Sequence, residues 1–129
     1  MILLDTHIWI WWVSESPQLT SRQRELIETQ QSKEIGVSIF SCWEIAKLVE
    51  KNRLQLSLPV EEWLGLALAY PGVVLLDLTL PIVLQSTRLK DFHNDPANQI
   101  IVATALVHQC PLLTMDGKIR SYPLVEILE

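Results

Sequence analysis

The 129-residue sequence predicts an α/β fold in which a parallel sheet of four to five strands is flanked by helices. Three observations support this. Short apolar runs of strand length alternate with longer segments of helical periodicity, so that helical crossovers join successive strands. Hydrophobic residues make up 49% of the chain and charged residues 19%, which suits a globular core. The length corresponds to a single domain over residues 1–129.

Five apolar runs have the length of strands. In chain order they are Met1–Leu4, Glu34–Ser38, Val73–Leu76, Leu112–Thr114 and Val125–Leu128. The first run contains no polar side chain, which predicts a strand buried on both faces. A Pro-Gly pair ends the preceding helix directly before the third run.

Six helices are expected, each opened by a residue that favours a helix N-terminus. These residues are, in order, Thr6, Thr20 or Ser21, Ser41, Pro59, Thr79 and Asp95. Proline is favoured in the first turn because its missing N–H would have no partner there. The segment Phe92–Asn94 is the one that we expect to be a flexible loop.

Composition restricts the class of protein. The formal net charge of −5 argues against a surface that coats nucleic acid, but not against a nuclease whose acidic ligands add negative charge. It also suits a basic partner that covers an acidic cleft. The start lacks a basic signal-peptide region, and the apolar stretch Ile8–Val13 is far shorter than the ~20 residues of a membrane span. Cys42 and Cys110 show no metal-ligand spacing, so we expect reduced thiols and a cytoplasmic protein.

Four acidic residues close apolar runs or open helices: Asp5, Glu44, Asp95 and Asp116. In a parallel α/β sheet, the carboxyl ends of the strands lie at one edge, where ligands bind. Carboxylates that gather there repel each other unless a hard cation such as Mg²⁺ or Mn²⁺ neutralises them. The pattern therefore predicts a metal-dependent phosphodiesterase, because divalent ions neutralise a phosphate and activate water.

Each acid also fits a purely structural role. Asp5 and Asp95 are suitable helix caps, and Asp116 is suitable for a turn before glycine. Ser41 and Glu44 have the spacing of a capping box. Only the joint placement of the four acids favours a metal site over these alternatives.

The ordered motifs resemble those of the PIN domain family, and more narrowly the VapC toxin ribonucleases of type II toxin–antitoxin operons. The motifs are Leu3–His7, Ser41–Ala46, Phe92–Ala97, Ile100–Leu106 and Leu113–Asp116. Their order and spacing match over essentially the whole chain. The resemblance implies a PIN-like three-layer sandwich and a Mg²⁺- or Mn²⁺-dependent, single-strand-specific endoribonuclease that uses metal-activated water. It also implies a homodimer, neutralisation by a cognate antitoxin and no membrane association.

On this resemblance, Asp5, Glu44 and Asp116 would bind the metal and carry catalysis, with Asp95 assisting. Four polar residues would support them: Thr6, Ser41, Asn98 and Thr114. A threonine beside a key acid can hydrogen-bond its carboxylate or a metal-bound water, and Thr114 is the stronger candidate.

One position departs from the family pattern. The family segment usually reads Asp-Pro-Ala-Asp-Arg, whereas this chain has Asn98 and Gln99 in the last two places. An amide oxygen can coordinate a cation, but it brings no charge and cannot act as a base. An alternative function is therefore a catalytically weakened PIN-like module that binds an antitoxin or RNA. A third hypothesis, a receiver-like phosphoacceptor domain, needs an acidic pair after the first strand, where only Asp5 stands.

Tryptophans and basic residues offer further candidates. The cluster Trp9, Trp11 and Trp12 favours core packing and a subunit contact over base stacking, and Trp43 and Trp63 favour core or antitoxin-groove positions. Five basic residues near Glu44 and Asp95 would suit an RNA path: Lys47, Lys51, Arg53, Arg88 and Lys90. A solvated helix face explains the spacing of Lys47 and Lys51 equally well.

Overall fold

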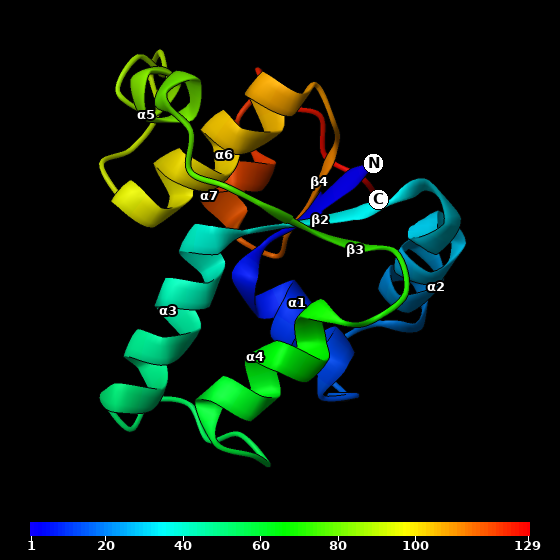
Figure 1. The fold of residues 1–129 in the computed structure, drawn as a ribbon. Coiled ribbons are helices and arrows are strands. Elements are labelled where there is room, and N and C mark those ends of the chain that lie inside the picture. Colours follow the sequence, from blue (N-terminus) through cyan, green and yellow to red (C-terminus); the bar gives the residue numbers. More distant parts are fainter.

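Four parallel strands form the sheet in the order β3-β2-β1-β4 in the computed structural model, which describes residues 1–129 (Figure 1). The strands are β1 (Ile2–Leu4), β2 (Ile35–Ser38), β3 (Val73–Leu76) and β4 (Leu112–Leu113). The central strand β1 pairs in parallel with both β2 and β4. The predicted parallel α/β sheet is therefore confirmed.

Seven α-helices and one short 3₁₀ helix complete the chain. They are α1 (Thr6–Val13), α2 (Ser21–Gln30), η1 (Gln31–Lys33), α3 (Ile39–Glu50), α4 (Val60–Leu68), α5 (Leu80–Ser86), α6 (Pro96–His108) and α7 (Gly117–Arg120). Figure 1 shows α5, α6 and α7 on one side of the sheet, and α1, α3 and α4 on the other. None of these helices combines the length and the apolar character that a bilayer crossing requires.

Each face of the sheet carries its own apolar core, because side chains alternate along a strand. Ile2 and Leu4 of β1 pack into the core beneath α1, α2 and α4, whereas Leu3 packs into the core with α6 and α7. The first core is built around Trp9, which is fully buried and meets Trp63 edge-on at 5.9 Å. The predicted three-layer sandwich is confirmed by this arrangement.

The capping chemistry explains several helix starts. Thr20 caps α2 and forms a reciprocal capping box with Gln23. Thr79 and Asp95 precede α5 and α6, as predicted, and each of these helices has proline in its first turn. The predicted fourth helix begins one residue after Pro59, which is its N-cap.

Two caps differ from the prediction. Helix α1 is capped by Asp5, and Thr6 is its first residue. Helix α3 is capped by Ser38, because β2 ends there in an extended conformation and the Ser38 hydroxyl accepts a hydrogen bond from Phe40 N. Ser41 lies inside the helix and is buried, so the predicted cap at Ser41 is wrong.

The C-terminal part differs in two further respects. The predicted fifth strand, Val125–Leu128, makes only one isolated parallel bridge, between Ile127 and Leu112. Strand β4 is only two residues long, so it cannot pair with Val125–Leu128 over a longer stretch, and the sheet has four strands. Asp116, which the sequence placed in a turn, caps the short helix α7, which was not predicted.

Candidate active site

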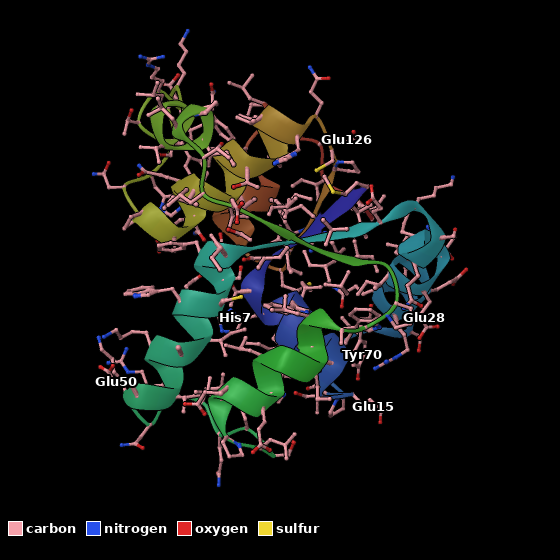
Figure 2. The ribbon with its side chains drawn as sticks, viewed as in Figure 1. His7, Glu15, Glu28, Glu50, Tyr70 and Glu126 are labelled. Atoms are coloured by element: carbon pink, nitrogen blue, oxygen red, sulfur yellow. The ribbon has the colours of Figure 1, made fainter.

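An open cleft of about 390 Å³ lies at the carboxyl edge of the sheet. It is lined by Asp5, His7, Trp11, Glu44, Asp95, Ala97, Asn98, Met115 and Asp116. Figure 2 shows His7 between the ribbons of α1 and α3. The four acids singled out from the sequence thus lie around one cleft, together with Asn98.

Three of the acids cap helices from within this cleft. Asp5, Asp95 and Asp116 cap α1, α6 and α7; one carboxylate oxygen accepts one backbone N–H in Asp5 and two in each of the others, at 2.7 to 3.2 Å. The partial positive charge at a helix N-terminus stabilises each carboxylate. The capping and ligand roles are therefore compatible, because a carboxylate has two oxygens and about four lone pairs.

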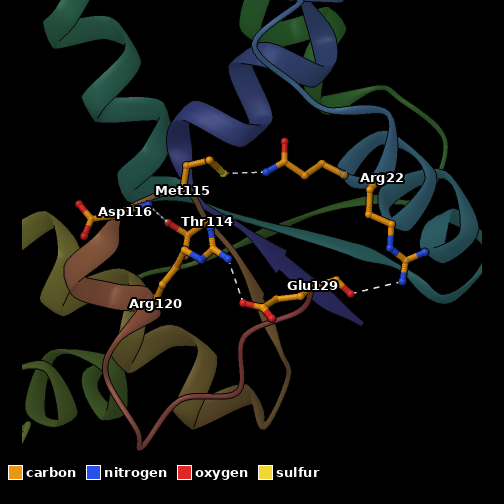
Figure 3. Close-up of polar contacts among 7 residues, drawn as sticks. Arg22, Thr114, Met115, Asp116, Arg120 and Glu129 are labelled. Atoms are coloured by element: carbon orange, nitrogen blue, oxygen red, sulfur yellow. Dashed lines mark hydrogen bonds and ion pairs between the residues drawn. The ribbon is translucent and has the colours of Figure 1, made fainter.

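Thr114 links two of these acids. Its Oγ1 donates to Asp5 Oδ2 at 2.6 Å and accepts a hydrogen bond from Asp116 N at 3.0 Å; Figure 3 shows the latter contact. Thr114 is buried directly after β4, which neighbours β1 in the sheet. The predicted hydrogen bond from Thr114 to a carboxylate is thus present, and it fixes the orientation of Asp5.

Thr6 and Ser41 form a second hydrogen-bonded chain. Thr6 Oγ1 lies 2.6 Å from Glu44 Oε1 and 2.8 Å from Ser41 Oγ. A hydroxyl has only one proton, and an ionised carboxylate can only accept. Thr6 therefore donates to Glu44 and accepts from Ser41. The alternative role in a capping box between Ser41 and Glu44 is wrong, because Ser41 lies inside α3 and Glu44 accepts from the Thr6 hydroxyl of α1.

Asn98 replaces the usual family acid and acts as a donor. Its Nδ2 donates to Asp116 Oδ2 at 3.1 Å and lies 3.2 Å from His93 Nε2, which can accept the second amide proton. Gln99, in the place of the family arginine, donates from Nε2 to the His93 carbonyl at 2.9 Å. The two departures from the family pattern thus anchor the loop around His93 to Asp116.

Burial raises the pKa of Asp5 and of Glu44 above their ordinary values. Hydrogen bonds from Thr114 and Thr6, respectively, oppose this shift, as does the nearby His7. Asp116 raises the pKa of Asp5 further, and Asp5 and Asp95 do the same for Glu44. Negative charge is therefore crowded in the cleft, and a bound cation would relieve it.

The donor chemistry fits a hard divalent cation that keeps part of its water shell. No three side chains of the Asp, Glu, His or Cys type lie close enough together in this structure to hold one ion between them. Mg²⁺ is usually bound through one or two carboxylates, with waters and substrate phosphates as further ligands. Glu44 Oε2 and Asp95 Oδ2 accept no hydrogen bond within the chain, and both residues line the open cleft.

Sequence reasoning missed part of the cleft wall. Trp11 was assigned to packing, yet it lies one helical turn from His7, with ring centroids 6.1 Å apart, and both line the cleft. The i, i+4 spacing of the two residues on α1 was the available signal. Met115 is 44% exposed between Thr114 and Asp116, and no pattern in the sequence marked it.

Comparisons with known proteins agree with this geometry. The PIN domain family matches residues 2–124. Ribonuclease VapC22 of Mycobacterium tuberculosis is 34% identical over 122 residues, which cover 94% of this chain and 91% of the relative. VapBC2 from Rickettsia felis, solved with a promoter DNA fragment, has a TM-score of 0.75 at 17% identity and covers 99% of this chain and 98% of its own. FitAcB from Neisseria gonorrhoeae has a TM-score of 0.71 at 21% identity and covers 100% and 97%. The two solved structures support the fold, and the family match over nearly the whole length shows that the chain belongs to the PIN domain family.

Proposed function

We propose that this protein is a metal-dependent endoribonuclease that acts as the toxin of a type II toxin–antitoxin module. The observation that carries the proposal is one cleft with four carboxylates at the carboxyl edge of a PIN sheet, in a chain related to a named ribonuclease. Its RNA substrate is found in the cytoplasm, which is the compartment we propose. Membership of the PIN domain family excludes the hypothesis of a receiver-like phosphoacceptor domain.

The proposed metal is Mg²⁺ or Mn²⁺. Asp5, Glu44 and Asp116 would hold it, with Asp95 assisting, because these side chains line the cleft and offer the oxygen ligands that such ions prefer. When bound, the ion neutralises charge on the scissile phosphate and activates a water for in-line attack.

The supporting residues hold the carboxylates in place before the substrate arrives. Thr6 orients Glu44, Thr114 orients Asp5, and Asn98 orients Asp116, each through one hydrogen bond. Hydrogen bonds from fixed donors limit the reorganisation that the reaction needs. The acidic cleft repels RNA phosphates by itself, so the residues favour substrate binding only together with a cation.

The binding-module alternative is not favoured. It rested on the loss of a charge at Asn98, but Asp5, Glu44 and Asp116 remain around the cleft. The relative that shares 34% identity carries the name ribonuclease. Asn98 does not supply the missing carboxylate, but it donates a hydrogen bond that orients the carboxylate of Asp116.

We propose a cognate antitoxin as the protein partner. A protein of the same fold from Klebsiella pneumoniae was solved as a toxin–antitoxin complex, and VapBC2 was solved on a fragment of its promoter DNA. The acidic cleft suits a basic side chain of such a partner. A small DNA-binding protein encoded beside this chain, and forming a complex with it on co-expression, would support this part of the proposal. Absence of any complex would contradict it.

We also propose a homodimer. Trp9 and Trp12 are buried inside the chain, so within the first helix only Trp11 of the tryptophan cluster is left to meet a partner subunit. Exposed apolar side chains instead gather at β3 and α5: Leu75, Leu78, Leu80, Val83 and Leu84. Such patches mark association surfaces. Leu80 is 68% exposed, so Leu80→Glu should shift the mass in light scattering from dimer to monomer; an unchanged mass would exclude this face.

The central test is RNA cleavage by purified variants. Asp5→Asn and Glu44→Gln should each lower kcat/KM by at least about 100-fold, because each removes a charge from the metal site. Glu28→Gln is the matched control, since Figure 2 shows Glu28 on α2, away from His7 and the cleft. EDTA should abolish cleavage, and Mg²⁺ or Mn²⁺ should restore it. Full activity of Asp5→Asn would remove this mechanism.

A further inference from the structure

Helix α3 carries an exposed aromatic pair beside the cleft. The sequence suggested a core or an antitoxin-groove position for Trp43 and Trp63; Trp63 is buried, whereas Trp43 is 55% exposed and does not belong to the core. Phe40 stacks on Trp43 with ring centroids 5.4 Å apart and an angle of 28° between the planes. A large indole that stays open to solvent adds little to folding. Its position is therefore better explained by a ligand.

The pair shares one face of α3 with a proposed catalytic acid. Phe40, Trp43, Glu44 and Lys47 are spaced at i, i+3, i+4 and i+7, which places them along one side of a helix. Glu44 lines the cleft, so this aromatic face continues directly from the cleft wall. A polymer whose reacting phosphate lies at Glu44 would extend its neighbouring unit over Trp43.

The same face offers positive charge. The ammonium of Lys47 lies 5.7 Å from the Trp43 ring centre and 3.0 Å from Glu50. An exposed ion pair of this kind is worth little, so a phosphate can take the place of Glu50. Lys51 ends the helix and Arg53 follows it. Lys47 and Lys51 lie about 4.5 and 10.5 Å beyond Glu44 along the helix axis.

We propose that Phe40 and Trp43 form a stacking subsite for one unpaired base next to the scissile phosphate of single-stranded RNA, with Lys47 on the flanking phosphate. This inference rests on the proposed ribonuclease function. Every base has a π-face, and stacking on aromatic side chains beside a cationic track is how single strands are bound. Because Phe40 already fixes the ring of Trp43, little side-chain freedom is lost when a base stacks on it. The subsite would exclude a paired base, whose faces are already covered.

The test compares steady-state cleavage of an unstructured RNA of about 12 nucleotides by wild type and variants. Trp43→Ala should raise KM about 5- to 150-fold, the range that corresponds to stacking of one base, while kcat changes little. Trp43→Phe should recover most of the loss. Leu66→Ala is the matched control, since Leu66 of α4 is 57% exposed and lies on another helix.

A scan with single abasic nucleotides locates the stacked base. At one position, removal of the base should raise the KM of wild type by the same factor as the Trp43→Ala substitution does. It should not raise the KM of Trp43→Ala further, because the two changes remove the same interaction. Lys47→Gln should reduce the salt dependence of log KM by about one unit of slope.

Three outcomes would overturn the inference. The first is a KM of Trp43→Ala equal to that of wild type. The second is that the effects of Trp43→Ala and of base removal add at every position, which would mean that no base contacts Trp43. The third is that Trp43→Ala loses only the antitoxin on co-purification, which would assign this face to a protein. A wild-type protein that cleaves no RNA would overturn the proposed function as well, so the two failures are distinguishable.

Discussion

Replacing Asn98 by aspartate tests the site most directly, because it restores the acid that the family pattern has at this position. The Asn98 amide donates to Asp116 Oδ2 at 3.1 Å. An aspartate of the same shape cannot donate this hydrogen bond when ionised, and it brings a second negative charge toward the first. The substitution therefore converts an attraction into a repulsion without changing the volume of the side chain.

The magnitude follows from the distance. Two unit charges about 4 Å apart repel by about 4 kcal/mol at the effective dielectric constant of 20 that suits sites near a protein surface. Loss of a hydrogen bond to a charged acceptor adds about 1.5–3 kcal/mol. Both side chains border an open cleft and can turn apart, which removes part of the repulsion. We therefore expect a destabilisation of about 2–4 kcal/mol without metal.

The assay is urea denaturation in EDTA and in saturating Mn²⁺. A ligand present at about 100 times its Kd stabilises the folded state by about 2.7 kcal/mol, so Mn²⁺ should restore most of the loss in Asn98→Asp. Calorimetric titration should show tighter Mn²⁺ binding by this variant than by wild type. The matched control is Asn94→Asp, which adds the same charge at an exposed loop position four residues earlier.

The reasoning is refuted if Asn98→Asp equals wild type in stability without metal. It is also refuted if Asn94→Asp loses as much stability, because the effect would then reflect net charge rather than the contact with Asp116. If Mn²⁺ stabilises Asn98→Asp no more than wild type, Asn98 does not border a cation site.

Three other changes have definite expected results. Thr114→Val removes the hydroxyl that donates to Asp5 and should lower the free energy of unfolding in urea by about 1.5–3 kcal/mol; a loss below about 0.5 kcal/mol would contradict the role of this contact. Burial raises the pKa of Asp5 above its ordinary 3.8, so the unfolded chain ionises first and stability falls as pH rises from 3.8 through the raised value. Metal-free Asp5→Asn should therefore melt at a higher temperature than wild type at neutral pH, and this advantage should disappear below pH 3.8; equal melting temperatures at neutral pH would contradict it. Gly72→Ala should cost at least about 1–2 kcal/mol in the same urea assay, because Gly72 has a φ of +85° and a Cβ there would overlap the Gln31 carbonyl oxygen. The control Gly65→Ala, in an exposed helix with open space, should instead stabilise by about 0.5–1 kcal/mol.

Local patterns predicted the elements that depend on local interactions. Val73–Leu76 is a strand over the predicted residues, since a Pro-Gly break precedes it and it has an apolar run of its own. Thr20 caps α2 through contacts within four residues. The predicted strand at Val125–Leu128 depended on a distant partner, β4, and that partner is too short to pair with it along its length. Helix α7 has four residues, which are too few to show the hydrophobic periodicity of a helix in the sequence.

The start of α3 shows where local chemistry is ambiguous. Ser38 and Ser41 both have the hydroxyl that a cap needs. The pairing of β2 with β3 extends to Ser38, which holds this residue in the extended conformation of an N-cap. Ser41 is thereby placed in the first turns of the helix, where it meets Thr6 of a helix 35 residues away in the sequence.

The sequence alone determined that Asp5, Asp95 and Asp116 stand at strand ends or helix starts, because apolar runs, caps and prolines act over a few neighbouring residues. Glu44 was expected near a helix start but lies inside α3. The sequence identified Asp5, Glu44, Asp95 and Asp116 as candidates, each with a structural role, in a helix cap or a turn, that competed with metal binding. Only the tertiary structure decided that Asp5, Asp95 and Asp116 cap helices and also line one cleft together with Glu44. A hydrogen bond requires a donor and an acceptor within about 3 Å, and for residues 35 to 109 positions apart that distance is set by the packing of the sheet and its helices.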